Sequence, residues 1–235
     1  MKNSFKFSKL EKTDQLVQTL KSLGVSEKDF LASGCTATVF KKGNQVIKVC
    51  RKDIRYFSNY TGDAQSFMDH INKLNHMFLP INEILYEDKN FFIYSQDFCE
   101  PLRSKEVDIQ LATEFLSLFK SMIKENCMVS GLSPFNLCNY HGKLVIFDYH
   151  GLHPLKKLKS GRIARNLVKY VSLAYCPHKY DEYRRLMDTF DEDSIDKLTK
   201  MPSSFIDLLH LMLDSKFSSQ SIIRQIDKCI KQINN

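Results

Sequence analysis

The residues best suited to chemistry are a lysine within an apolar strand and an asparagine and an aspartate on either side of a turn. Lys48 lies in the segment VIKV, where its ammonium group needs a partner because a buried, unpaired charge is costly. Asn136 precedes a turn and an apolar strand, and that strand ends at Asp148. Upstream, the small residues around Gly34 leave room for backbone amides to approach a phosphate group. These residue types suit a site for a phosphate-bearing ligand.

In their order along the chain, these motifs resemble those of the protein-kinase superfamily, and the resemblance covers roughly residues 28–175. The segment LASGCTATV, Leu31–Val39, matches the glycine-rich loop, with Ala32 and Ala37 in place of the outer glycines. The segment VSGLSPFNLCNYHGKLVIFDYHG, Val129–Gly151, resembles the catalytic loop, the following hairpin and the metal-binding segment. Its SPFN form is the one found in small-molecule kinases. The resemblance implies a kinase-like fold that binds ATP and Mg²⁺.

The resemblance also implies a role for each matching residue. Lys48 would contact the α- and β-phosphates and pair with an acidic residue of the helix that follows it. That helix has no glutamate, so the pair is either Lys48–Asp69 or absent. Asn136 and Asp148 would hold Mg²⁺, which takes few protein ligands and leaves its other positions to phosphate and water. The predicted nucleotide-binding residues are Gly34, Thr36, Ala37, Val39, Lys48 and Asp69.

The catalytic aspartate of the superfamily is missing from this chain. If Asn136 fixes the register, Gly131 occupies its position, and a shift by one residue places Leu132 there. Neither residue is a base, and His150 is the candidate substitute, although a lone histidine is more often structural. General-base catalysis contributes about 10²–10⁴-fold, whereas phosphoryl transfer depends mainly on positioning and electrostatics. We therefore expect phosphoryl transfer to be greatly slowed and not necessarily abolished.

Two functional classes remain open. The first is an atypical phosphotransferase that moves the γ-phosphate of ATP onto a hydroxyl group. The segment Gly161–Tyr175 is similar to that of bacterial lipopolysaccharide-core and Kdo-type sugar kinases, which implies a sugar or glycolipid acceptor, with a protein acceptor as the lesser alternative. The second class is a pseudokinase, a module that binds nucleotide and docks a partner protein. The missing aspartate favours the second class, whereas Lys48, Asn136 and Asp148 favour at least nucleotide binding.

A cluster of basic residues indicates a contact with anionic groups. The net charge is +7, and part of the excess lies between Lys156 and Lys169. Such a run suits an anionic membrane surface or a glycolipid, and the alternative is a solvated face. Nucleic acid is not expected as a partner, because aromatic interleaving and known binding motifs are absent. The basic residues are Lys156, Lys157, Lys159, Arg162, Arg165 and Lys169.

Composition and cysteine content bear on the compartment. The sequence shows neither a signal-peptide pattern nor an apolar run of membrane-span length. We therefore expect a cytoplasmic protein, either free or peripheral to a membrane. The seven cysteines are odd in number and form no CxxC pair. This pattern predicts reduced, mostly buried thiols rather than a disulfide framework or a zinc site.

Two lobes are expected to position these residues. A sheet-rich lobe, 1–98, and a mainly helical lobe, 99–235, predict an α+β, protein-kinase-like fold with a cleft between the lobes, where ligands often bind. The periodicity predicts helices over 13–23, 62–75, 109–126, 162–175, 179–190, 203–213 and 221–233. Strands are expected as a pair within 30–50, at 81–86 and at 91–95, with a further hairpin within 137–148.

Overall fold

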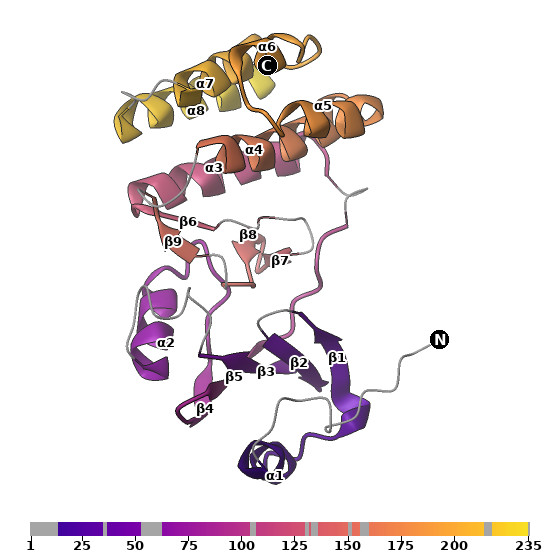
Figure 1. The fold of residues 1–235 in the computed structure, drawn as a ribbon, viewed down its shortest axis with the longest axis vertical. Coiled ribbons are helices and arrows are strands. Elements are labelled where there is room, and N and C mark those ends of the chain that lie inside the picture. Colours follow the sequence, from indigo (N-terminus) through magenta and orange to yellow (C-terminus); the bar gives the residue numbers. More distant parts are fainter. Residues whose placement is uncertain are drawn as a thin grey trace. The chain divides into compact units, whose positions relative to one another are not determined.

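The protein has an α+β architecture and divides into two compact units, Met1–Phe98 and Cys99–Asn235 (Figure 1). The N-terminal unit holds an antiparallel sheet, and the C-terminal unit is mainly helical. Among the described helices, none combines the length and the apolar character needed to cross a membrane. A computed structural model describes residues 14–34, 37–52, 63–103, 107–129, 132, 136–149, 152–155, 160–213 and 218–234.

The described sheet of the N-terminal unit is antiparallel, with the strand order β1-β2-β3-β5-β4. Its strands are β1 (Phe30–Ser33), β2 (Ala37–Lys42), β3 (Gln45–Arg51), β4 (Glu83–Glu87) and β5 (Phe91–Asp97). The two strands expected within 30–50 are confirmed as β2 and β3, but a third strand, β1, was not expected; the Gly34 N–H donates to the Ala37 carbonyl (2.9 Å) where β1 pairs with β2. Strand β1 is mostly exposed, so it lacks the alternating burial that marks a strand in a sequence.

Helix α1 (Asp14–Ser22) covers one face of this sheet. Its Leu16 and Leu20 are fully buried and pack with Phe40, Ile47 and Ile93 from three neighbouring strands. Burying each of these side chains stabilises the unit by roughly 1.5–3 kcal/mol. The amphipathic helix expected here is confirmed, although its expected first residue lies outside the described part of the chain.

Helix α2 (Ala64–Lys73) lies on the opposite face of the sheet from α1 (Figure 1). Its first turn is capped by Asp63, whose side chain accepts a hydrogen bond from the Ser66 N–H (2.7 Å). That hydrogen bond lowers the pKa of the Asp63 carboxyl. Phe67 of α2 meets Phe92 of β5 edge to face, with ring centroids 5.7 Å apart. Since Phe92 and Ile93 are adjacent on one strand, they point to opposite faces.

The C-terminal unit is built from packed helices. Phe115 of α3 stacks on Tyr170 of α4, with ring centroids 3.7 Å apart. Gln225 and Cys229 of α8 both donate to the Ser204 carbonyl of α7 (2.8 and 3.0 Å). The helices are α3 (Ile109–Lys124), α4 (Ser160–Tyr175), α5 (Tyr180–Leu186), α6 (Glu192–Asp196), α7 (Ser203–Leu213) and α8 (Ser219–Ile233).

The helix expected over 179–190 is shorter in the structure. Helix α5 ends at Leu186, and Phe190 has a left-handed backbone with φ of 46°. Asp191 then caps α6 by accepting a hydrogen bond from the Ser194 N–H (2.8 Å). A separate short helix, α6, therefore follows beyond the end of the expected helix, and the periodicity did not predict it.

Two short antiparallel ladders complete the C-terminal unit. Strand β6 (Cys127–Val129) pairs with β9 (Leu152–Pro154), and β7 (Leu137–Tyr140) pairs with β8 (Lys143–Ile146). The hairpin of β7 and β8 confirms the one expected within 137–148.

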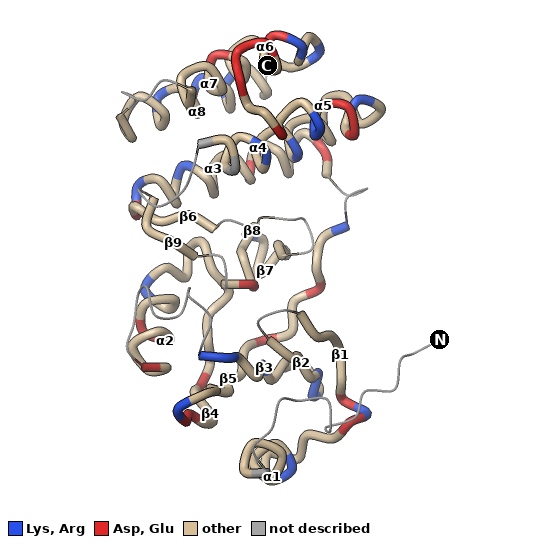
Figure 2. The backbone as a smooth tube through the Cα atoms, in the orientation of Figure 1, with Lys and Arg blue, Asp and Glu red and all other residues tan. Residues whose placement is uncertain are grey.

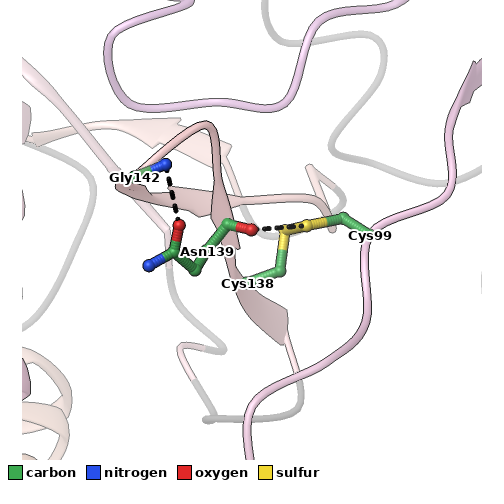
Figure 3. Close-up of a disulfide and its surroundings, with 4 residues drawn as sticks. All are labelled: Cys99, Cys138, Asn139 and Gly142. Carbon is green, nitrogen blue, oxygen red and sulfur yellow. Dashed lines mark hydrogen bonds between the residues drawn. A yellow bond between two sulfur atoms is a disulfide. The ribbon is translucent and has the colours of Figure 1, made fainter.

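A disulfide joins Cys99 to Cys138, so the expectation that the cysteines are reduced is wrong for this pair (Figure 3). Their Cα atoms are 6.0 Å apart, a distance that a disulfide spans without backbone movement. The cysteines are 39 residues apart in sequence, and neither an odd count nor the absence of CxxC reports on so distant a pair. Cys35 lies outside the described residues, and the free, buried cysteines are Cys50, Cys127, Cys176 and Cys229.

Candidate functional site

The small-residue hairpin of the N-terminal unit is the turn between β1 and β2. Besides the bond from Gly34 to Ala37, the hydroxyl groups of Ser33 and Thr38 form a hydrogen bond (3.1 Å) across the two strands. Among the described residues, the atom nearest to a Cβ added at Gly34 would be the Ala37 carbonyl oxygen, at 4.0 Å. The described neighbours of Gly34 therefore leave room for a side chain. Thr36 lies outside the described residues.

Lys48 lies near the centre of β3 and is buried, with 5% of its surface exposed. Its partners in the neighbouring strands are Val39 on β2 and Tyr94 on β5. Since side chains alternate along a strand, Ala37 shares this face, which is the one opposite to α1. Three of the predicted nucleotide-binding residues, Ala37, Val39 and Lys48, thus belong to one face of the sheet.

A row of aromatic rings connects Lys48 to α2. The Lys48 Nζ lies 5.9 Å from the centroid of the Tyr94 ring, within the range of a cation–π contact. Tyr94 stacks on Phe92 at 5.8 Å, and Phe92 meets Phe67 of α2. The sequence predicts a strand at 91–95 but does not single out Tyr94, because the register that sets Tyr94 opposite Lys48 depends on pairing between distant segments.

Asp69 lies on the exposed side of α2, where its carboxylate accepts a hydrogen bond from Gln65 Nε2 (3.0 Å). At about 100° per residue, Asp69 stands roughly 200° around the helix from Phe67, which faces the sheet. The structure therefore brings Phe67, rather than Asp69, to the side of α2 that meets the strands. The pairing of Asp69 with Lys48 stays a prediction.

The β7–β8 hairpin of the C-terminal unit brings Asn136 and Asp148 to the same end. Leu137 pairs with Ile146, and beyond that pair the Phe147 N–H donates to the Asn136 carbonyl (3.1 Å). Asn136 therefore stands opposite Phe147, the immediate neighbour of Asp148. Both candidate ligands are half-buried. Amide and carboxylate oxygens are hard donors of the kind that Mg²⁺ prefers, so the donor set fits this ion.

The turn of this hairpin has a backbone geometry that suits its sequence. His141 and Gly142 both have positive φ (51° and 77°), as a two-residue type I′ turn requires. The Asn139 side-chain oxygen accepts a hydrogen bond from the Gly142 N–H (2.9 Å), which braces the turn (Figure 3). Local interactions thus hold the two strands that end near Asn136 and Asp148.

The structure describes only part of the segment in which the resemblance places a catalytic aspartate. Leu132, the residue in the shifted register, is buried with 2% of its surface exposed, so an aliphatic core side chain occupies that position. Gly131 and His150 lie outside the described residues. Val129 precedes Gly131 in the sequence and Leu152 follows His150, and these two residues pair in the β6–β9 ladder.

Figure 2 marks the described Lys and Arg residues in blue, and two of those in the basic run make contacts within the C-terminal unit. Arg165 forms an ion pair with Asp188 (3.0 Å), and both side chains are exposed, so the pair contributes about 0–1 kcal/mol. Lys169 is half-buried, and burial, followed by the positive charge of Arg184, lowers the pKa of its ammonium group. These two residues of α4 thus interact with the segments that follow it. Lys156, Lys157, Lys159 and the side chain of Arg162 lie outside the described residues.

Comparison with known proteins does not assign the chain to a family. No protein-family model matches it, and no curated protein matches it. Within the described ranges, no group of three or more His, Cys, Asp or Glu side chains is arranged to hold a metal ion. Any functional assignment therefore rests on the residues named above and on their geometry.

Proposed function

We propose that this chain is a Mg·ATP-binding phosphotransferase with a protein-kinase-like, two-lobed fold. It would transfer the γ-phosphate slowly to a hydroxyl group, for which a sugar or a glycolipid is the proposed acceptor. The observation that carries the proposal is the pair of oxygen donors, Asn136 and Asp148, at one end of the β7–β8 hairpin. Two protein ligands of this type leave room for the phosphate oxygens and waters that complete a Mg²⁺ shell.

The N-terminal unit supplies the residues proposed to hold the phosphates. Lys48 is buried on the face of the sheet that it shares with Ala37 and Val39, and we assign its ammonium group to the α- and β-phosphates. The contact with the Tyr94 ring restricts where that ammonium group can lie. The hairpin at Gly34 would present backbone amides, and it tolerates close approach because its residues are small. Bound Mg²⁺ would offset the negative charge of the phosphate oxygens during transfer.

The turnover number that we expect for phosphoryl transfer follows from the lack of a general base at Leu132. Leu132 is buried and apolar, so it cannot take the proton from an acceptor hydroxyl. Kinases turn over at about 1–100 s⁻¹, and loss of a general base lowers the rate by about 10²–10⁴-fold. We therefore expect a turnover number on the order of 10⁻⁴ to 1 s⁻¹.

The second candidate function is that of a pseudokinase, which binds Mg·ATP and acts by docking a partner protein. The observation that favours it is the same buried Leu132, since an apolar side chain there gives no support to proton transfer. The two functions share the nucleotide site and differ only in transfer.

Nucleotide binding is tested by the thermal unfolding of the full chain with and without Mg·ATP. A ligand at 100 times its Kd stabilises the protein by about 2.7 kcal/mol, which gives a measurable shift of the midpoint. Lys48→Met and Asp148→Asn change charge with little change in volume, and each should abolish the shift. Lys143→Met removes a positive charge from an exposed position on β8 and should preserve it. If the first two variants keep the full shift, the proposed site is wrong.

Transfer is then tested with ATP labelled at the γ-phosphate and with sugar, glycolipid and protein acceptors. Asp148→Asn provides the blank for contaminating kinases. Labelling that depends on Asp148 supports the phosphotransferase, and the acceptor that becomes labelled identifies the substrate class. Binding that is lost in Asp148→Asn, without any transfer by the wild type, would instead establish the pseudokinase.

A further inference from the structure

The Cys99–Cys138 disulfide ties the first segment of the C-terminal unit to the hairpin that carries Asn136 (Figure 3). Cys138 lies within β7, close behind Asn136 in the sequence. The same segment is attached to β7 a second time, because the Leu102 N–H donates to the Leu137 carbonyl (2.9 Å). The disulfide is thus the covalent part of a two-point attachment along the strand that leads out of the proposed metal site.

The two sulfur atoms differ in their access to solvent. Cys138 is fully buried, whereas Cys99 is partly exposed. The other described cysteines are buried, and burial raises the pKa of the Cys127 thiol to about 12 and that of Cys229 to about 11, which makes them poor nucleophiles. Cys99 is therefore the most exposed of the described cysteines and the one at which we expect an external thiolate to attack.

The surroundings also accommodate the reduced form. The Asn139 carbonyl oxygen lies 3.3 Å from the Cys99 Sγ (Figure 3), so a free thiol at Cys99 would find an acceptor already in place. Reduction then leaves no polar group at Cys99 without a partner. What the protein loses on reduction is the covalent link between the segment at Cys99 and β7.

That link bears directly on the proposed metal ligands. Asn136 continues into β7, and its carbonyl accepts the hydrogen bond from Phe147, which precedes Asp148. Because β7 is held at Cys138, the open end of the hairpin, where Asn136 and Asp148 both lie, is held as well. Releasing the strand lets these residues move before a metal–nucleotide complex binds, and ordering them again weakens binding.

We propose that Cys99–Cys138 is a thiol–disulfide switch that sets how firmly β7 holds Asn136 for Mg·ATP, an inference that rests on the proposed function. In the forward step, the thiolate of a small thiol such as glutathione attacks the Cys99 Sγ, forms a mixed disulfide and releases the Cys138 thiolate. A second thiolate attacks the outer sulfur of the mixed disulfide and releases Cys99. The two protein sulfurs together gain two electrons and two protons, and the small thiol is oxidised to its disulfide. Glutathione disulfide reverses both steps.

The test compares oxidised and reduced wild type in titrations with Mg·ATP. The reduced form should bind at least about fivefold more weakly, at the lower end of ordinary coupling between sites. The variant Cys99→Ser cannot form the bond but keeps a donor for the Asn139 carbonyl. It should bind like the reduced protein and should show no response to reductant.

Hydrogen exchange on the same samples gives a readout that does not need the nucleotide. Backbone amides of β7 and β8 should exchange faster after reduction and recover their protection after treatment with glutathione disulfide. If the reduced form exchanges faster but neither form binds Mg·ATP, the disulfide controls the mobility of the hairpin and the proposed function is rejected. Equal measurable affinities in the two forms, or equal exchange rates, would overturn the switch. If Cys99 and Cys138 can both still be alkylated after treatment with glutathione disulfide, the disulfide has not re-formed, and the switch is overturned as well.

Discussion

Loss of the Cys99–Cys138 disulfide should destabilise the C-terminal unit by an amount that its loop length sets. The bond closes a loop between residues that are 39 apart in sequence. With that length, the chain-entropy relation gives a stabilisation of about 4 kcal/mol at 25 °C, because the cross-link restricts the unfolded chain. Cys99→Ser is the variant of choice, since a hydroxyl at this partly exposed position can still donate to the Asn139 carbonyl. The folded state then loses little besides the bond.

The assay is urea unfolding of oxidised wild type and of Cys99→Ser, followed by far-ultraviolet circular dichroism. This signal reports mainly on the helical C-terminal unit, and it is preferable to intrinsic fluorescence because the chain has no tryptophan. With a urea dependence of about 1–3 kcal/mol per molar, a loss of 4 kcal/mol lowers the midpoint by roughly 1.3–4 M. Such a loss is a large share of the roughly 5–15 kcal/mol that stabilises a typical domain.

Reductant provides the matched control for this experiment. It should lower the midpoint of wild type to that of Cys99→Ser and leave the variant unchanged. If oxidised and reduced wild type unfold at the same urea concentration, the loop-closure reasoning is refuted. A midpoint of Cys99→Ser far below that of reduced wild type would show instead that the substitution damages the folded state.

Three further predictions concern stability. Tyr170→Phe should raise the free energy of unfolding by about 1 kcal/mol, because the buried Tyr170 hydroxyl has no hydrogen-bond partner among the described residues and the substitution keeps the stack on Phe115. Chemical denaturation measures this change, and a loss of stability would contradict the prediction. Gly142→Ala should cost about 1 kcal/mol, because its φ of 77° disfavours a side chain although no atom lies within 4 Å of an added Cβ; Gly34→Ala, which has no such φ, is the control and should be nearly neutral. Burial, with a smaller effect of a nearby lysine, lowers the pKa of His70, so the unfolded state takes up a proton at higher pH than the folded state does. The stability due to neutral His70 is therefore present above about pH 6.5 and is lost as pH falls toward the folded-state pKa; urea midpoints between about pH 7.5 and about pH 5 should fall less in His70→Gln than in wild type.

Elements that bury one face along a continuous segment could be predicted from the sequence. Helix α3 begins at Ile109, as its apolar periodicity predicts, because every turn adds a side chain to the core. The hairpin of β7 and β8 was predictable for a different reason. Its turn at His141–Gly142 has positive φ, which glycine adopts readily, and short apolar strands lie on both sides of it.

Features that depend on distant pairing could not be predicted in the same way. Strands β6 and β9 have only three residues each, and they become strands because Val129 meets Leu152 across a long stretch of sequence. Strand β1 is exposed, so no apolar pattern marks it. The Cys99–Cys138 pair and the register of Tyr94 opposite Lys48 are of the same kind. In each case the local structure depends on pairing with a segment distant in sequence, and the residues of one segment alone do not predict it.

The proposed metal ligands and Leu132 belong to different parts of the C-terminal unit. Asn136 and Asp148 are placed by the turn at Gly142, by the bond between Phe147 and Asn136 and by the disulfide at Cys138, all of which act within or directly on one hairpin. Leu132 contributes to none of these contacts and serves the apolar core instead. Under the proposed function, an aliphatic residue there provides no proton acceptor and leaves undisturbed the hairpin that would bind the metal. We therefore expect binding of Mg·ATP and transfer of its γ-phosphate to be separable, so that a failure to detect transfer would not count against the proposed nucleotide site.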